Sequence, residues 1–173
     1  MKIKSILAIS VLAMTACTAA YAGDNPLRVD SKDGFYAGIS LGQFAVHGSE
    51  DASGSAFAGG LNGGYRHYFN DRLSVDANVA LIAANSGSSD KFVIPTVSLG
   101  YDFPLSNGMV IRPKVGAGYH FDSYSDGSYS NYVLKTGVDL DINKHVTVGI
   151  DYNFMKGRQN NGSLVLFNVG YKF

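Results

Sequence analysis

The residue type best suited to catalysis in this chain is histidine, which occurs at four positions: His47, His67, His120 and His145. His47 has Ser49 and Glu50 close behind it but falls in a predicted loop, so His120 is the best placed, followed by Asp122 and Ser123 near the end of a predicted strand. A histidine that activates a serine and is oriented by an acid supports acyl hydrolysis. In an extended strand, however, His120 and Ser123 would project from opposite faces. We therefore expect no catalytic site.

The sequence has no pattern for binding a metal, a nucleotide or a nucleic acid. Its one cysteine, Cys17, cannot form an internal disulfide or a multi-cysteine metal site. It contains no phosphate-binding loop and no dinucleotide fingerprint. The 14 Lys and Arg residues balance the 14 Asp and Glu residues, so no excess of positive charge favours nucleic acid. We expect no cofactor and no nucleic-acid partner.

The composition of the 173 residues disfavours a helical domain, soluble or membrane-embedded. Of the 14 acidic residues, 13 are Asp and only Glu50 is glutamate, and Asp is the poorer helix former. The 11 Tyr and 10 Phe residues, with only 16% charged residues, argue against disorder. The mean hydropathy of +0.03 is too low for a protein built of apolar helices. It is compatible with a membrane β-barrel, whose residues alternate between lipid and interior.

The first 22 residues have the features of a secretory signal peptide. Lys2 and Lys4 precede an apolar run over residues 6–14, and an Ala-Tyr-Ala sequence ends at Ala22. The apolar run is too short to cross a bilayer as a helix, which takes about 20 residues. We predict cleavage after Ala22. The alternatives are an uncleaved anchor and a lipoprotein-type cleavage that leaves Cys17 lipidated.

After a polar leader over residues 23–33, polar and apolar residues alternate with a period of two. In residues 146–155, for example, Val146, Val148 and Ile150 alternate with Thr147 and Gly149. This pattern predicts strands. The runs exceed the ~5–6 residues of a usual strand and suit the ~9–11 residues of a tilted membrane strand. Eight runs span about residues 34–46, 55–68, 73–84, 91–103, 109–122, 131–142, 146–155 and 163–173.

The connections between these runs alternate in length. Three are short turns, over about residues 69–72, 104–108 and 143–145. Four are longer and rich in Gly, Ser, Asn and Asp, over about residues 47–54, 85–90, 123–130 and 156–162. Short turns at one end and longer loops at the other are typical of an outer membrane barrel with both termini in the periplasm. Pro95 and Pro113 should disturb pairing locally, because proline cannot donate a ladder hydrogen bond.

One face of these strands carries five basic and five acidic side chains. The interior of an eight-stranded barrel is just filled by side chains, and an unpaired charge there is costly. Counting across the short turns places Arg66 opposite Asp76, and Asp102 opposite Arg112. We therefore predict a charge network in the lumen, made of Arg66, Asp76, Asp102, Arg112, Lys114, Lys135, Asp139, Asp141, Asp151 and Lys172.

The charged face is also rich in glycine, which weakens strands but leaves room between long side chains in a confined interior. The opposite face carries aromatic residues toward both strand ends, where the girdles at two membrane surfaces are expected. Both features favour an apolar face that is turned outward to lipid. The alternative is a soluble periplasmic ligand-binding barrel with its apolar face turned inward, as in a lipocalin.

Four motifs resemble the small eight-stranded outer membrane β-barrels of the OmpA/OmpX-like and opacity-protein-like family. They lie at residues 34–42 (GFYAGISLG), 64–66 (GYR), 115–119 (VGAGY) and 169–173 (VGYKF). The resemblance covers about residues 34–173 and implies an all-β fold, a closed antiparallel eight-stranded transmembrane β-barrel. It also implies that Val169, Tyr171 and Phe173 form the signal to the barrel-insertion machinery.

The resemblance further implies an integral outer membrane protein, surrounded by the lipids of that membrane, with a structural or adhesion-like role and little or no open pore. The alternation of Tyr with Ser and Gly around Tyr124 and Tyr129 suits a recognition surface on an exposed loop. The alternatives are a lipid A-modifying acyl hydrolase or transferase and a small porin-like channel. Against the hydrolase, the family's deacylases place His and Ser two residues apart, whereas His120 and Ser123 are three apart.

Overall fold

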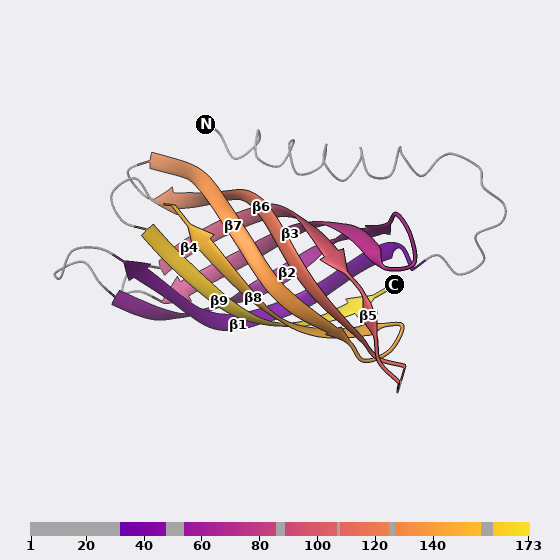
Figure 1. The fold of residues 1–173 in the computed structure, drawn as a ribbon. Coiled ribbons are helices and arrows are strands. Elements are labelled where there is room, and N and C mark those ends of the chain that lie inside the picture. Colours follow the sequence, from indigo (N-terminus) through magenta and orange to yellow (C-terminus); the bar gives the residue numbers. More distant parts are fainter. Residues whose placement is uncertain (1–31, 48–53, 86–88, 107, 125–126, 157–160) are drawn as a thin grey trace.

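The chain forms one antiparallel sheet that closes on itself into a barrel (Figure 1). The computed structural model describes residues 32–47, 54–85, 89–106, 108–124, 127–156 and 161–173. Each strand pairs with the next along the chain, except that β4 pairs with β6 and not with the short β5, and β1 pairs with β9 to close the barrel. The strands are β1 Gly34–His47, β2 Gly54–Tyr68, β3 Leu73–Asn85, β4 Ser89–Tyr101, β5 Phe103–Pro104, β6 Val110–Tyr124, β7 Gly127–Asp141, β8 Val146–Met155 and β9 Asn161–Lys172.

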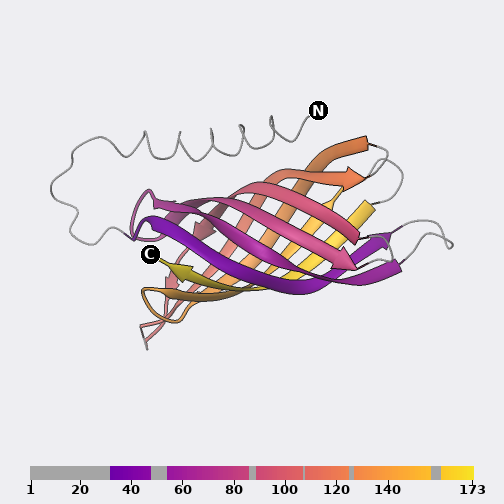
Figure 2. The same ribbon diagram turned by 180° about the vertical axis from the view of Figure 1, so that it is seen from behind.

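The predicted fold class, a closed eight-stranded antiparallel barrel, is confirmed. The two-residue β5 continues β4 beyond a break at Asp102, and both segments pair with β6, so they occupy one position in the barrel. The three predicted short turns lie after β2, β5 and β7. Figures 1 and 2 show that these turns lie at the same end of the barrel as the C-terminus. We call this end the short-turn end and the opposite one the loop end.

One predicted loop is wrong. Most of the segment 123–130 belongs to β6 and β7, whose ladder runs without interruption from Val110 opposite Asp141 to Tyr124 opposite Gly127. The alternation of Tyr with Ser in this segment is itself a period-two pattern, and this explains why the strands extend through it. Tyr124 and Tyr129 therefore lie in a strand hairpin at the loop end; the positions of their side chains are outside the described part of the structure.

Pro95 and Pro113 interrupt the ladder between β4 and β6, as predicted. The β4–β6 pairing passes from Val93 directly to Thr96, so Pro95 has no partner on this side. The same pairing stops at Lys114 and resumes through β5, which leaves Pro113 out. Each proline remains paired with the strand on its other side. The prolines thus loosen a single seam of the barrel.

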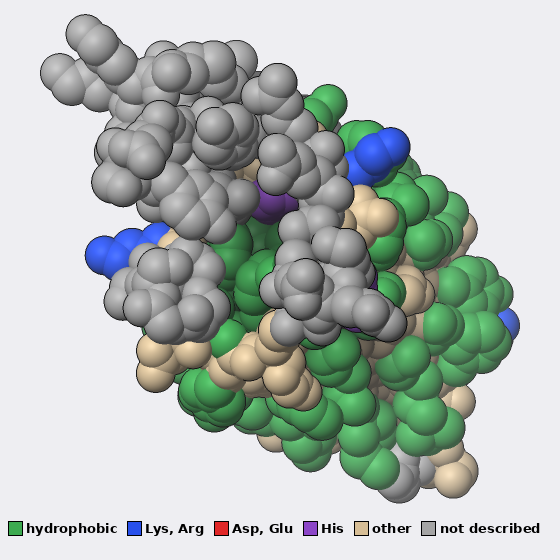
Figure 3. All heavy atoms as spheres, turned by 90° about the vertical axis from the view of Figure 1, so that its left-hand side faces the viewer, with side chains coloured by type: hydrophobic (Ala, Val, Ile, Leu, Met, Phe, Trp, Pro, Cys, Tyr) green, Lys and Arg blue, Asp and Glu red, His purple; other side chains and the backbone are tan. Residues whose placement is uncertain are grey.

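The two faces of the sheet alternate between a buried interior and an exposed apolar wall. Along β3, Ser74, Asp76 and Asn78 are buried, whereas the residues between them are more exposed. Large apolar side chains such as Leu61 and Val115 are exposed on the outside, and Figure 3 shows hydrophobic side chains over much of the flank visible from the loop end. Within the described ranges, no helix is long and apolar enough to cross a membrane.

Aromatic side chains lie on the outer wall toward both ends of the barrel. At the short-turn end, the ring centroids of Tyr101 and Phe103 are 5.0 Å apart, and those of Tyr171 and Phe173 are 5.4 Å apart. Tyr119 and Tyr152 are exposed in the part of the wall that leads to the loop end. Two bands of rings suit two membrane interfaces.

Candidate functional site

The part of the lumen near the short-turn end is filled by an ion-pair network centred on Arg112. This side chain is 2% exposed. Its Nε lies 2.5 Å from Asp102 Oδ1, and its Nη2 lies 2.6 Å from Asp141 Oδ2. Nη2 also donates to the Tyr68 hydroxyl at 2.5 Å. Such charge-assisted hydrogen bonds satisfy a buried guanidinium.

Arg66 connects this group to two further strands. Its Nε lies 3.3 Å from Asp76 Oδ2, the partner expected from counting across the short turn. Its Nη2 lies 3.1 Å from Asp139 Oδ2, and its Nη1 lies 3.8 Å from Asp141 Oδ1. Because β2 and β7 are not neighbours in the sheet, the contact between Arg66 and Asp139 crosses the lumen.

Two lysines extend the ion pairs toward the middle of the barrel. Lys114 Nζ lies 2.6 Å from Asp139 Oδ1 and 2.9 Å from Asp151 Oδ1, and Lys135 Nζ lies 2.9 Å from Asp151 Oδ2. Nine of the ten predicted lumen residues are thus joined by ion pairs. The tenth, Lys172, donates instead to the backbone carbonyl of Lys32 at the short-turn end.

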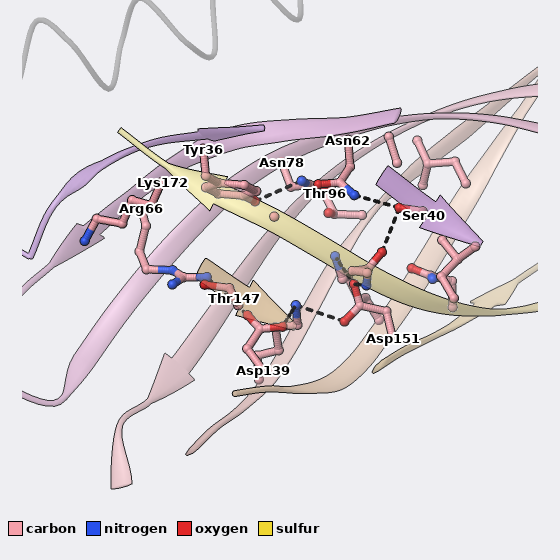
Figure 4. Close-up of a pocket in the computed structure, with 18 residues that line it drawn as sticks. Tyr36, Ser40, Asn62, Arg66, Asn78, Thr96, Asp139, Thr147, Asp151 and Lys172 are labelled. Atoms are coloured by element: carbon pink, nitrogen blue, oxygen red, sulfur yellow. Dashed lines mark hydrogen bonds and ion pairs between the residues drawn. The ribbon is translucent and has the colours of Figure 1, made fainter. Parts of the chain in front are cut away.

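A cavity of about 50 Å³ lies beside this network, and Figure 4 shows polar side chains around it. Ser40 accepts from Asn62 at 2.6 Å and donates to Asn168 Oδ1 at 2.7 Å. Tyr36 donates to Asp76 Oδ1 at 2.7 Å and accepts from Asn78 at 2.9 Å. The cavity has room for a few water molecules. These uncharged residues were not predicted from the sequence, although they occupy the same period-two face as the charges.

The interior near the loop end is largely apolar, which the predicted polar lumen face did not anticipate. Phe92 lies there with its ring centroid 5.0 Å from that of Phe44. We call the following set the apolar layer: Phe44, Ala56, Ala58, Ala80, Ile82, Ala84, Phe92, Ile94, Val133, Met155, Leu164 and Leu166. The charges that distinguished the two faces lie near the short turns, so they gave no information about inward positions farther along the strands.

The histidines do not form a catalytic constellation with the groups that the structure describes. His120 is 5% exposed, while the side chain of Ser123 lies outside the described part. His47 contacts Ser163 Oγ at 2.8 Å, and His145 Nδ1 contacts the Lys172 carbonyl at 3.0 Å. In the same part of the chain, no cluster of three or more His, Cys, Asp or Glu side chains is placed to hold a metal ion.

The C-terminal residues of the predicted assembly signal lie on the outer wall. Val169, Tyr171 and Phe173 are exposed, Phe173 to 73%. The Phe173 backbone N–H donates to the Phe35 carbonyl at 3.0 Å. The ring of Phe173 therefore adds little to the packing of the folded barrel.

The sequence model of a known protein family, the outer membrane protein β-barrel domain, matches residues 8–173 of this chain. The chain belongs to this family. Membership agrees with the closed sheet and with the apolar outer wall. No curated protein sequence matches the chain.

Solved structures of the outer membrane barrel type share this fold. The chain is similar to Neisserial surface protein A, NspA, with a TM-score of 0.55, 18% identity and coverage of 83% of this chain and 98% of that one. It is similar to the outer membrane enzyme PagL, with a TM-score of 0.56, 14% identity and coverage of 78% of this chain and 98% of that one. It is also similar to the N-terminal barrel domain of Pseudomonas aeruginosa OprF, with a TM-score of 0.50, 16% identity and coverage of 80% of this chain and 97% of that one. At such identities, the similarity shows the fold and no shared activity.

Proposed function

We propose that this chain is an integral outer membrane β-barrel with a structural or surface-interaction role, without catalysis and without an open pore. The observation that carries this proposal is the filling of the lumen by two unlike parts. Ion pairs occupy the part near the short-turn end, and the apolar layer occupies the part near the loop end. An ion would have to break the first and then lose its hydration in the second.

The apolar layer is the second barrier to ions. Hydrophobic constrictions stop ions by excluding water, and an eight-stranded barrel has little interior space beyond that filled by side chains. Leu164 and Val133 are fully buried, and Ile94 is nearly so. The cavity of about 50 Å³ lies beside the ion pairs. It can hold water next to the charged side chains, but it does not form a path for ions through the barrel.

The absence of catalysis is supported by the surroundings of His120. A hydrolase acting on a lipid needs its nucleophile and base at a surface that the lipid reaches. His120 is buried in the inward register of β6. Ser123 stands at the opposite parity of the same strand. The proposed role therefore rests on the barrel and its loop end.

Export and assembly follow from the two ends of the chain. We propose that residues 1–22, which lie outside the described part, act as a cleaved signal peptide, and that the barrel-insertion machinery reads Val169, Tyr171 and Phe173. The exposed positions of these three residues support the second idea, because side chains that add little to packing remain available for recognition.

Because the lumen is filled, we expect the protein to conduct no ionic current in planar bilayers. We expect no steady current steps from the refolded, unaltered chain in concentrated KCl. Combining Phe92→Ala with Ile94→Ala should give small steps, because the widened apolar layer admits water. Leu99→Ala, on the outer wall, is the matched control and should stay silent. Steady steps from the unaltered chain would contradict the proposal that the lumen is filled and does not conduct.

The surface role predicts that the β6–β7 hairpin contributes to adhesion. Bacteria that display the unaltered chain should adhere to an epithelial monolayer, and Tyr124→Ser with Tyr129→Ser should reduce adhesion about tenfold, as for aromatic contacts worth about 1.4 kcal/mol. Tyr101→Ser, toward the short-turn end, should have no effect. Lipid A from the same cells should be unchanged. A change in lipid A acylation that His120→Ala abolishes would instead support the enzyme alternative.

A further inference from the structure

A groove of about 330 Å³ lies on the outer wall, over strands β1, β2 and β3. Its outward side chains are those of Phe35, Leu61, Val79 and Leu81. Gly63 lies at the bottom of the groove, between its ladder partners Ala37 on β1 and Val79 on β3. Because the neighbours of Gly63 along the strand face the lumen, Gly63 itself belongs to the lipid-facing register. The groove is thus an apolar hollow in the membrane-facing wall.

The packing of the barrel restricts position 63 much less than it restricts an inward glycine position. A Cβ on Gly60, in the inward register, would lie 1.8 Å from the Leu81 carbonyl oxygen. A Cβ on Gly63 would lie 3.3 Å from its nearest heavy atom, the Tyr36 carbonyl oxygen. A Cβ at position 63 therefore requires the Tyr36 carbonyl to shift by only a few tenths of an ångström. The missing side chain shapes the outer wall and leaves the interior unaffected.

His67 lies on the same outward register of β2 as Gly63, nearer the short-turn end, and its ring contacts the buried Asp33. His67 Nδ1 lies 2.7 Å from Asp33 Oδ2, and Asp33 Oδ1 accepts the Tyr68 backbone N–H at 2.8 Å. The Asp33 side chain is 2% exposed, whereas the His67 side chain is 38% exposed. Asp33 therefore holds the His67 ring at Nδ1, while the side chain as a whole remains partly accessible.

Two cationic side chains, Lys32 and Arg72, lie at the same rim of the barrel as His67. Lys32 Nζ donates to the Asp71 carbonyl at 2.7 Å, beside the exposed Arg72. The Phe69 ring is exposed, and it packs edge-on to the His67 ring at 5.4 Å. Cations and aromatic rings at a membrane surface suit a phosphate that lies above an acyl chain.

We propose that the groove over Gly63 holds an acyl chain of a phospholipid from the periplasmic leaflet, with the lipid phosphate at His67, Lys32 and Arg72. The periplasmic leaflet follows from the short turns at this end. The charge at the rim argues against a second copy of the chain in the groove, because a two-fold contact brings identical surfaces together and would place like charges near each other. This inference rests on membership of the membrane-barrel family, and it is independent of the proposed adhesive role.

Lipid retention tests the proposal. The refolded, delipidated barrel is mixed with dioleoyl phosphatidylglycerol in mild detergent, and bound lipid is counted by native mass spectrometry. The unaltered chain should retain one lipid. Gly63→Leu fills the groove, and His67→Asn removes the ring; each should reduce retention about tenfold, a factor typical of losing one charge-assisted hydrogen bond or equivalent packing. Ala117→Leu, on the outer wall of β6, should retain lipid normally.

Several outcomes would overturn the proposal. Equal retention by Gly63→Leu and Ala117→Leu would remove the groove as the site, as would retention of added lipopolysaccharide with none of the phospholipid. Dimers that Gly63→Leu abolishes would assign the groove to a second copy. Heat-dependent gel mobility checks that each variant is folded. If Gly63→Leu does not fold, Gly63→Ala and His67→Asn decide the question, and unchanged retention in both contradicts the proposal. Failure of the adhesion experiment would leave all these results unaffected.

Discussion

Arg112→Met is expected to prevent stable folding of the barrel. The substitution leaves Asp102 buried without its cation and removes the cation nearest to Asp141. Breaking a buried ion pair on one side costs about 3–5 kcal/mol, a large part of the stability of a domain. In urea titrations of the protein refolded in detergent, we expect a much lower midpoint and loss of the heat-modifiable gel band.

Two control variants separate an uncompensated charge from a general loss of arginine. Arg72→Met changes an exposed side chain and should shift the free energy of unfolding by about 0–1 kcal/mol. Adding Asp102→Asn to Arg112→Met should restore part of the stability, because it removes one of the stranded charges. Wild-type stability of Arg112→Met would contradict the ion-pair network as described.

Gly42→Ala is expected to have an effect of the same size for a steric reason. A Cβ at position 42 would lie 1.8 Å from the Val165 carbonyl oxygen and 2.8 Å from its carbon. Both atoms are backbone of the paired strand β9, so no side chain can move aside. Relief requires the two strands to separate, and we expect destabilisation of more than about 4 kcal/mol, measured by the same urea titration.

Gly170→Ala is the matched control for this steric prediction. Gly170 lies on the same pair of strands and in the same inward register, but a Cβ there would meet its nearest atom, the Ala37 carbonyl oxygen, at 3.7 Å. The change of residue type is identical, so strand propensity and chain entropy are matched. Equal losses of stability in the two variants would show that close approach of the strands is not the cause.

The strands and the cross-strand charge pairs could be predicted from the sequence because both depend on local order. A short turn fixes the register of the strands that it joins, and this places Arg66 opposite Asp76. The period of two then determines which residues share a face. Residues 123–130 were misinterpreted because tyrosine and serine favour exposed loops as well as strands, so composition outweighed the period.

The contacts across the lumen could not be predicted in the same way. The pairing of Arg66 with Asp139 joins strands that are not neighbours, and it depends on the closure of the whole barrel and on the stagger of its strands. The apolar layer posed a different difficulty, because inward and outward positions near the loop end carry similar apolar residues. The Asp33–His67 contact was missed because Asp33 belongs to a leader without period.

The contacts across the lumen also have a mechanical consequence. A sheet held only by its backbone ladder can be squeezed from a circular to an oval cross-section without breaking a ladder bond. Arg66 ties β2 to β7, and Arg112 ties β6 to the Tyr68 hydroxyl on β2. Flattening the barrel along one axis lengthens some of these ties and compresses others. Near the short-turn end, the barrel should therefore keep its circular cross-section under the lateral pressure of the bilayer. Around the apolar layer, where side chains are held by packing alone, the cross-section should deform more easily.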